Sequence, residues 1–246
     1  MSKLRLLDLF SGIGGFSLGL ERSGGFETVA FCEIEDFPRR VLAKHWPKVP
    51  CYHDIRELTA ARLAADGIAV DAICGGFPCT NVSLAGDGTG LEGSESGLWY
   101  EYERLIGELE PEVVFLENVS ELCNRGLGDI LGALASFGLD AEWHCIPASY
   151  AGAKSLRDRI WVVAYAKRYS VQGRAIFTAA WQAKSRAEQL AGLVQPCAWP
   201  TVSGSRDRGT GHGVPNGIHR NRALGNAVVP QIPELLGRAW MEASHD

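Results

Sequence analysis

The sequence lacks any long hydrophobic run. Apolar stretches such as Val113–Leu116 are far shorter than the roughly 18 residues that a membrane-spanning helix requires. The N-terminus has no apolar segment followed by a small-residue cleavage site, so we expect no export signal and a cytoplasmic location. With 246 residues, of which 46% are hydrophobic and 22% charged, the composition is that of a globular chain and excludes disordered and fibrous proteins.

The sequence also lacks the spacings that disulfide frameworks and metal sites require. Its seven cysteines are an odd number and include no C-x-x-C pair. The six histidines show neither H-E-x-x-H nor another paired spacing. We therefore expect reduced thiols and no bound metal.

Positive charge is scarce in the first part of the chain. Residues 1–150 contain 11 Lys and Arg against 23 Asp and Glu, whereas residues 151–246 contain 13 against 6. The net charge of -5 therefore divides into -12 and +7. Such a basic region is typical of a surface that faces a nucleic acid, although an ordinary solvated surface has the same composition.

Short apolar runs alternate with helix-length stretches over the first 165 residues. This order favours an α/β fold with a doubly wound, mostly parallel sheet of the Rossmann-like kind. The expected strands are Leu4–Asp8, Thr28–Glu33, Asp71–Cys74, Val113–Glu117, Glu142–Ile146 and Arg159–Ala164. The expected helices are Phe16–Arg22, Phe37–His45, Gly97–Glu108, Leu127–Phe137 and Ile232–Met241. We divide the chain into a main domain at 1–166, a small irregular region at 167–220 and a C-terminal segment at 221–246 that returns to the main domain.

A glycine-rich turn follows the first expected strand, in the segment D-L-F-S-G-I-G-G-F at Asp8–Phe16. Its glycines permit a tight turn that brings backbone N–H groups against a ligand, but the spacing is not G-x-G-x-x-G. Glu33 ends the second expected strand, where an acidic side chain can accept hydrogen bonds from ribose hydroxyls. Asp54 follows a further short strand and can face the same crevice. Together these features favour an adenosine-containing ligand.

A thiol and a carboxylate stand at the ends of two neighbouring expected strands. Cys79 follows Pro78, just past the strand Asp71–Cys74, and Glu117 ends the strand Val113–Glu117. Open α/β sheets place their active sites at the carboxyl ends of the strands. A lone cysteine is more often a packing residue and a lone glutamate a surface residue, so it is their pairing that favours a catalytic site.

Six motifs in this chain resemble, in the same order, those of the DNA (cytosine-5) methyltransferases. The first is D-L-F-S-G-I-G-G, and Glu33 and Asp54 match the acidic residues that follow it. The nucleophile motif, usually P-C-Q, reads P-C-T at residues 78–80, and E-N-V stands at 117–119. The arginine motif, usually Q-x-R-x-R, reads S-L-R-D-R at 155–159, and G-N-x-V-x-P stands at 225–230. The resemblance runs from Leu7 almost to the C-terminus and is to the bacterial or phage type.

The resemblance implies methyl transfer from S-adenosyl-L-methionine to carbon 5 of cytosine in double-stranded DNA. Cys79 would add to carbon 6, and Glu117 would stabilise the charge on the ring. The target base would have to be flipped out of the duplex, because a stacked base cannot reach the thiol. The implied catalytic residues are Cys79, Glu117, Arg157 and Arg159. The implied cofactor-binding residues are Asp8, Phe10, Ser11, Gly12, Gly14, Gly15, Glu33, Ile34, Asp54, Ile55, Pro78, Leu98, Asn226 and Val228.

DNA contacts are expected from two groups of residues. Thr80 and Ser83 follow the nucleophile, in a glycine-rich stretch suited to closing over a flipped base. Loops rich in glycine and arginine suit the approach to DNA phosphates, so we expect phosphate contacts from four arginines of the C-terminal part. These are Arg206, Arg208, Arg220 and Arg222. The alternative is that they are ordinary solvated loop charges. The stretch of chain that is free to contact base edges, residues 167–199, is short, so we expect the protein to recognise a short or degenerate DNA sequence.

Two substitutions depart from the family pattern, and they keep other readings open. Thr80 and Ser155 replace the usual glutamines, so we expect altered loop or DNA contacts with the chemistry intact. One rival reading is the same chemistry on tRNA. Others are a catalytically silent DNA-binding module and, more remotely, a cysteine hydrolase. We expect the protein to be a monomer.

Overall fold

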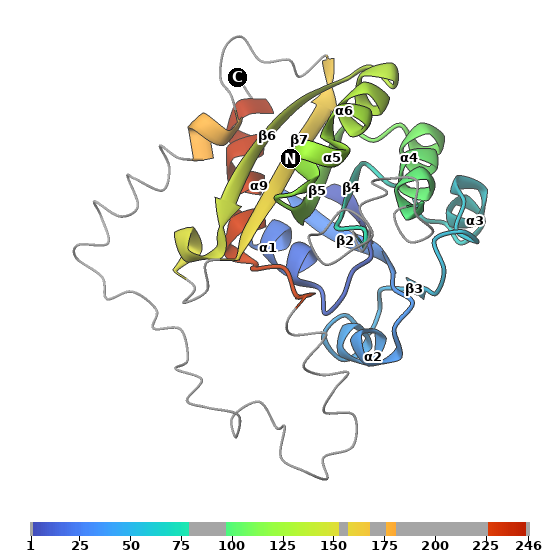
Figure 1. Ribbon diagram of the computed structural model, residues 1–246. Coiled ribbons are helices and arrows are strands. Elements are labelled where there is room, and N and C mark those ends of the chain that lie inside the picture. Colours follow the sequence, from blue (N-terminus) through green and yellow to red (C-terminus); the bar gives the residue numbers. More distant parts are fainter. Residues whose placement is uncertain (1, 79–96, 153–156, 168–175, 181–225, 245–246) are drawn as a thin grey trace.

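The computed structural model describes residues 2–78, 97–152, 157–167, 176–180 and 226–244. Its centre is a seven-stranded sheet with the order β3-β2-β1-β4-β5-β7-β6 (Figure 1). The strands are β1 (Leu4–Leu9), β2 (Phe26–Cys32), β3 (Cys51–Tyr52), β4 (Ala72–Gly75), β5 (Val113–Val119), β6 (Leu139–Pro147) and β7 (Asp158–Ala166). The first five strands are parallel, and β7 is antiparallel to both of its neighbours. The predicted α/β class with a mostly parallel sheet is confirmed.

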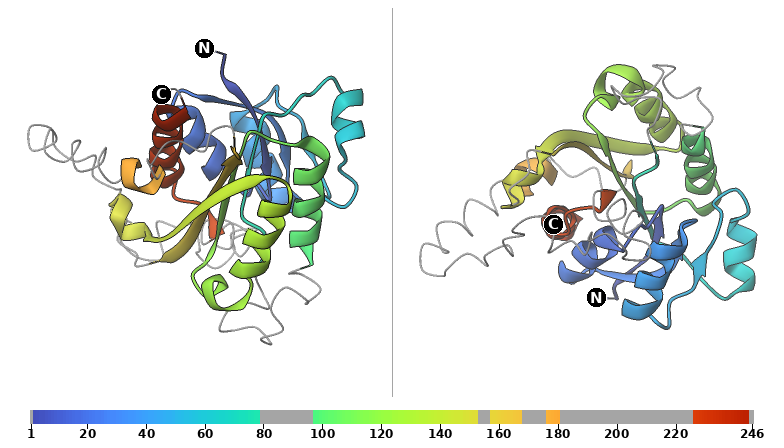
Figure 2. Two further views of the ribbon diagram at one scale, coloured as in Figure 1. Left: turned by 90° about the horizontal axis from the view of Figure 1, so that it is seen from above. Right: turned by 60° about the horizontal axis from the view of Figure 1, so that its bottom comes forward.

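Helices cover both faces of the sheet (Figure 2). They are α1 (Gly15–Arg22), α2 (Asp36–His45), α3 (Ala60–Ala65), α4 (Leu98–Leu109), α5 (Leu122–Arg125), α6 (Leu127–Ser136), the 3-10 helix η2 (Ala148–Ala151) and α9 (Gln231–Ser244). One apolar cluster lies between the sheet and α3, α4 and α6, and a second lies between the sheet, α1 and α9. None of the helices in the described ranges is long and apolar enough to cross a membrane.

The antiparallel end of the sheet follows from the length of one connection. Only the residues from Ala148 to Arg157 join β6 to β7, and a parallel neighbour would need a longer crossover. The two strands therefore pair over their full length, from Leu139 opposite Ala166 to Pro147 opposite Asp158. The same arrangement places the start of β7 beside the end of β5.

The C-terminal segment returns to the main domain through α1. A side chain at Gly15 would place its Cβ 2.5 Å from the backbone oxygen of Val228, and one at Gly19 would collide with that of Pro230. Ile232, Leu236 and Trp240 of α9 are buried in the cluster beside α1. The short helical stretch at residues 176–180 packs into this cluster too, so part of the region at 167–220 contacts the main domain.

We predict that Gly19→Ala destabilises the protein by about 1–3 kcal/mol, because the added methyl group displaces the backbone that leads into α9. Gly132→Ala is the matched control, since Gly132 lies inside the exposed part of α6 with open space around it. The control should stabilise the protein by up to about 1 kcal/mol. Urea unfolding followed by circular dichroism measures both changes. Equal stability of the two variants would contradict the close packing of α1 and the C-terminal segment.

Candidate active site

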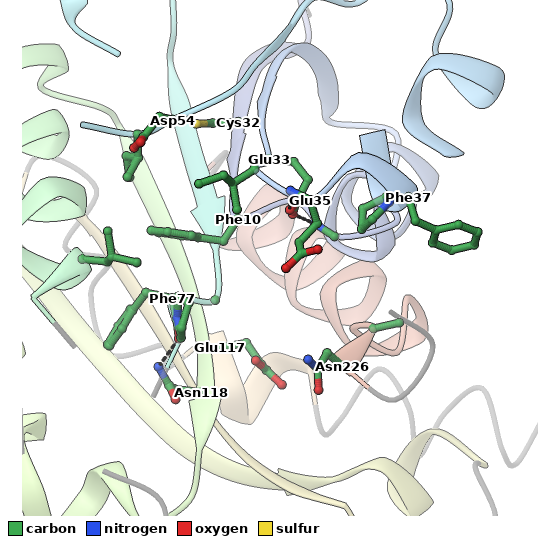
Figure 3. A pocket seen from close by; sticks show the side chains of 18 of the residues that line it. Phe10, Cys32, Glu33, Glu35, Phe37, Asp54, Phe77, Glu117, Asn118 and Asn226 are labelled. Atoms are coloured by element: carbon green, nitrogen blue, oxygen red, sulfur yellow. Dashed lines mark hydrogen bonds between the residues drawn. The ribbon is translucent and has the colours of Figure 1, made fainter. Parts of the chain in front are cut away.

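A cavity of about 560 Å³ opens at the carboxyl ends of β1, β2, β4 and β5. Figure 3 shows Phe10 in the middle of this cavity, with Glu33 and Asp54 on one side of it and Glu117 and Asn226 on the other. The acidic residues follow β2 and β3, whereas Glu117 lies near the end of β5. One continuous space therefore connects Glu33 and Asp54, assigned from the sequence to a nucleoside ligand, with Glu117, one of the residues assigned to catalysis.

The turn after β1 forms the floor of the cavity. Phe10 has a φ of 53°, which is unusual for a residue with a side chain and is a form of local strain that functional sites often contain. Gly12, with a φ of 54°, donates its backbone N–H to Oε2 of Glu33 over 2.7 Å. The turn is thus joined to the end of β2 by a hydrogen bond to a carboxylate.

Glu33 is held from two sides. Its Oε1 accepts a hydrogen bond of 2.8 Å from the backbone N–H of Glu35, opposite to the bond from Gly12. Burial raises the pKa of Glu33, and the backbone N–H groups that stabilise the charged form oppose this rise. The carboxylate is fixed at the rim of the cavity, and each of its oxygens retains a lone pair for a further donor.

Asp54 lines the cavity beyond Phe10, as predicted. Its carboxylate forms an ion pair with Arg56, with Nη2 and Oδ2 2.6 Å apart, and the hydrogen bonds from this arginine lower the pKa of Asp54. The loop that carries Asp54 is anchored by Arg104 of α4, which donates to the backbone oxygens of Ile55 and Leu58 over 3.0 and 2.8 Å. Arg104 could not be identified from the sequence, because charged residues on a helix that serve as anchors have the same pattern as those of a solvated face.

Glu117 lies between two guanidinium groups. Its Oε1 is 3.0 Å from Nε of Arg159 and 3.8 Å from Nη2 of Arg157. The residue is only 8% exposed, and this burial raises the pKa of Glu117, while Arg159 and Arg157 act in the opposite direction. The antiparallel register brings the three residues together, since Val119 pairs with Arg159 and Glu117 with Trp161.

The two arginines differ in what else they contact. Arg157 donates to the backbone oxygens of Ala227 and Asn226, over 2.9 and 3.0 Å, and so attaches the C-terminal segment to the edge of the cavity. Arg159 lies closer to Glu117, and its Nη1 donates a hydrogen bond to the backbone oxygen of Asp158. From the sequence, either arginine could bind the base. Their contacts in the structure indicate different roles for the two.

Asn118 lines the cavity and joins two segments of its wall, a position that was not predicted from the sequence. Its side-chain N–H donates to the backbone oxygen of Phe77 over 3.1 Å, shown by the dashed line in Figure 3. Its Oδ1 accepts from the backbone N–H of Val119. Asn118 thereby joins the end of β5 to the segment that leads to Pro78, the residue before Cys79. Its place inside the E-N-V motif was the available signal.

The cavity brings together most of the predicted cofactor residues that the structure describes. Those that line it are Phe10, Gly12, Glu33, Ile34, Asp54, Ile55, Pro78, Leu98 and Asn226. The catalytic candidates Glu117, Arg157 and Arg159 line it too. Predicted residues that lie outside the described ranges are Cys79, Thr80, Ser83, Arg206, Arg208, Arg220 and Arg222.

Five predicted cofactor residues do not line the cavity: Asp8, Ser11, Gly14, Gly15 and Val228. Asp8 is 1% exposed, and its Oδ2 accepts hydrogen bonds from the hydroxyl and backbone N–H of Ser17 in α1. Burial raises the pKa of Asp8 to about 7. The expectation that Asp8 faces a ligand is thereby corrected: this carboxyl holds the start of α1 from behind the turn.

Metal-binding groups were not expected from the sequence. Within the described ranges, no cluster of three or more His, Cys, Asp or Glu residues could hold a metal ion.

The cavity combines an acidic end, formed by Glu33, Glu35 and Asp54, with a buried carboxyl group, that of Glu117, beside two arginines.

A mostly parallel seven-stranded sheet with such a cavity defines a Rossmann-like methyltransferase fold. The chain belongs to the C-5 cytosine-specific DNA methylase family, which it matches over residues 4–200.

Individual relatives are of the same kind. The chain is 35% identical over 167 residues to the type II methyltransferase M.CviJI of Paramecium bursaria Chlorella virus IL3A, covering 67% of this chain and 44% of that protein. It is 30% identical over 176 residues to M.HhaI of Haemophilus parahaemolyticus, covering 70% and 52%. The chain thus spans about half the length of the curated relatives it matches.

A solved methyltransferase covers nearly the whole chain. EhMeth of Entamoeba histolytica superposes with a TM-score of 0.68 over 98% of this chain and 99% of its own, at 13% sequence identity. At this level of identity the similarity concerns the fold alone.

We predict that Arg159→Gln raises the pKa of Glu117 further, because the substitution removes the nearest positive charge. Arg157→Gln should raise this pKa less, since its guanidinium lies 3.8 Å away. Carbon-13 NMR titration of glutamate carboxyl groups, with the Glu117 signal assigned through Glu117→Gln, compares the variants. An unchanged pKa in Arg159→Gln would contradict the electrostatic pairing.

Proposed function

We propose that this protein transfers a methyl group from S-adenosyl-L-methionine to carbon 5 of cytosine in duplex DNA, through a covalent adduct of Cys79. The observation that carries the proposal is the single cavity. It connects the acidic end at Glu33 with the buried Glu117 and its partner Arg159, and Pro78 in its wall immediately precedes Cys79. Membership of the cytosine-5 methylase family supports the same conclusion.

The residues of the cavity fit the methyl donor. Glu33 offers free lone pairs to ribose hydroxyls, while Phe10, Ile34, Ile55 and Leu98 offer apolar surface to an adenine ring. The acidic end also suits a sulfonium cation better than a phosphorylated nucleotide. When bound, S-adenosylmethionine supplies an electrophilic methyl group.

Cytosine carbon 5 is a weak nucleophile, so the ring has to be activated first. In the proposed reaction the thiolate of Cys79 adds to carbon 6, and the electron pair displaced from the 5,6 double bond moves into the ring. A protonated Glu117 hydrogen-bonded to N3 would neutralise the developing charge. The raised pKa of Glu117 favours this protonated form. Carbon 5 would then form a bond to the methyl group of the donor, the methyl–sulfur bond would break and S-adenosylhomocysteine would leave. Loss of the carbon 5 proton and expulsion of the Cys79 thiolate would restore the ring.

The arginines would have separate tasks. Arg159, 3.0 Å from Glu117, is the better candidate for binding the carbonyl oxygen of the base. Arg157 is attached to the backbone of Asn226 and Ala227 and would hold the C-terminal segment in place. Thr80, Ser83 and the arginines at 206, 208, 220 and 222 remain the proposed DNA contacts. Cytoplasmic location and a monomeric state remain predictions.

Transfer of the same methyl group to tRNA is the second candidate. A side-by-side assay with radiolabelled S-adenosylmethionine, duplex DNA and tRNA distinguishes the two. Incorporation into tRNA alone would contradict the proposal, and bisulfite sequencing of methylated plasmid DNA would identify the target sequence.

We predict that Cys79→Ser lowers methyl transfer by at least roughly a thousandfold while leaving donor binding nearly unchanged. DNA that carries 5-fluorocytosine should trap the wild-type protein covalently, because fluorine blocks the final proton removal. Cys51→Ser is the matched control, since Cys51 lies outside the cavity wall. Substantial transfer by the Cys79 variant would remove this residue from its proposed role.

We also predict that Glu33→Ala weakens S-adenosylmethionine binding by roughly tenfold to a hundredfold, the effect of losing charge-assisted hydrogen bonds. Isothermal titration calorimetry measures the dissociation constant directly. Glu35→Ala tests the neighbouring carboxylate and should bind nearly as well as the wild type, because it is the backbone N–H of Glu35 that supports Glu33. The reverse order of affinities would identify Glu35 as the ribose ligand.

A further inference from the structure

Two exposed thiols meet at the surface of the molecule, outside the wall of the cavity. Cys123 belongs to α5 and Cys145 to β6, and their sulfur atoms are 3.6 Å apart. Both side chains are exposed, whereas Cys32 and Cys74 are buried in the apolar clusters. A pair of thiols at this distance in contact with solvent is open to reaction with small molecules.

We propose that Cys123 and Cys145 form a dithiol modification site that reacts with low-molecular-weight disulfides such as glutathione disulfide. One thiolate attacks a sulfur of the reagent, forms a mixed disulfide and releases one glutathione thiolate. The second cysteine then attacks the cysteine sulfur of this mixed disulfide, which closes the bond between Cys123 and Cys145 and releases the other glutathione thiolate. The two cysteines lose two electrons and two protons, and the reagent is reduced to two glutathione molecules.

The geometry of the pair favours the second step over a lasting mixed disulfide. Burial and the neighbouring thiol raise the pKa of Cys145 to about 11, which makes this thiol a weak nucleophile towards reagents from solution. Its sulfur is nevertheless held 3.6 Å from that of Cys123, and this proximity speeds the reaction between the two cysteines.

The local structure permits the bond to close. A disulfide requires the sulfur atoms to approach to about 2.05 Å. Cys123 lies in α5, a helix of four residues that ends at Arg125, just before Gly126, and such a short segment can shift more easily than a strand within the sheet. Cys145 lies in β6, which is hydrogen-bonded to β7 along its whole length.

The bond would act close to the candidate active site. Cys123 follows the E-N-V segment by four residues, and Cys145 pairs with Ile160, next to Arg159. A disulfide would fix α5 against β6 and thereby limit movement of the chain that follows Glu117. The site itself consists of thiols alone and does not depend on the proposed methyl transfer.

Mass spectrometry of the complete folded chain tests the proposal. Trypsin cleaves after Arg125, and the peptides 105–125 and 126–154 contain one cysteine each, Cys123 and Cys145. The protein is incubated with glutathione disulfide, its free thiols are blocked with N-ethylmaleimide in acid, and it is digested without reduction. The expected product is a linked pair of these two peptides that dithiothreitol separates.

Two controls make the result decisive. Cys123→Ser and Cys145→Ser should lose the linked pair and, at most, carry glutathione on the remaining cysteine. The wild type should form the link at least tenfold faster when folded than in urea, because only the folded chain holds the sulfur atoms together. Mixed disulfides without a link in the folded wild type, or equal rates in urea, would overturn the proposal.

Discussion

The close approach of α1 to the C-terminal segment is the constraint on which the site depends. Glycines at positions 15 and 19 leave room for the backbone at Val228 and Pro230, so α9 can pack against α1. The residues just before α9 are thereby brought to the cavity, where Arg157 binds their carbonyl groups. Two small residues in the first helix are thus required for the segment at residues 226–227 to reach the part of the cavity that contains Glu117.

Hydrogen bonds to backbone atoms provide the second layer of order. Glu33, Asn118 and Arg157 each bond to main-chain groups of another segment: Gly12 and Glu35, Phe77, and residues 226–227. Polar side chains used in this way fix the loops at the ends of the strands while the strands themselves are held by the sheet. The cavity therefore has a defined shape although its wall consists mainly of loops.

The sequence predicted the parallel strands well because each is a short, mostly apolar run that is buried on both faces. It expected a short strand before Asp54 without bounds, which is β3 with its two residues, and it missed α3 and α5, whose lengths of six and four residues leave little periodicity to detect. The reversed direction of β7 depends on the short connection through η2 and is not visible in the strand's own residues. The motifs singled out Glu33, Asp54 and Glu117, and all three line the cavity. They could not distinguish Asp8, which supports α1, from residues that line the cavity, because this distinction depends on which way a side chain points.

The pairing of α1 with α9 also has a consequence for synthesis of the protein on the ribosome. Phe16 and Leu20 of α1 belong to a cluster that is completed by Ile232, Leu236 and Trp240, about two hundred residues later. A nascent chain therefore carries an uncovered apolar surface from the synthesis of α1 until α9 emerges from the ribosome. Chains that stop early keep this surface exposed, which makes them natural clients of chaperones and proteases.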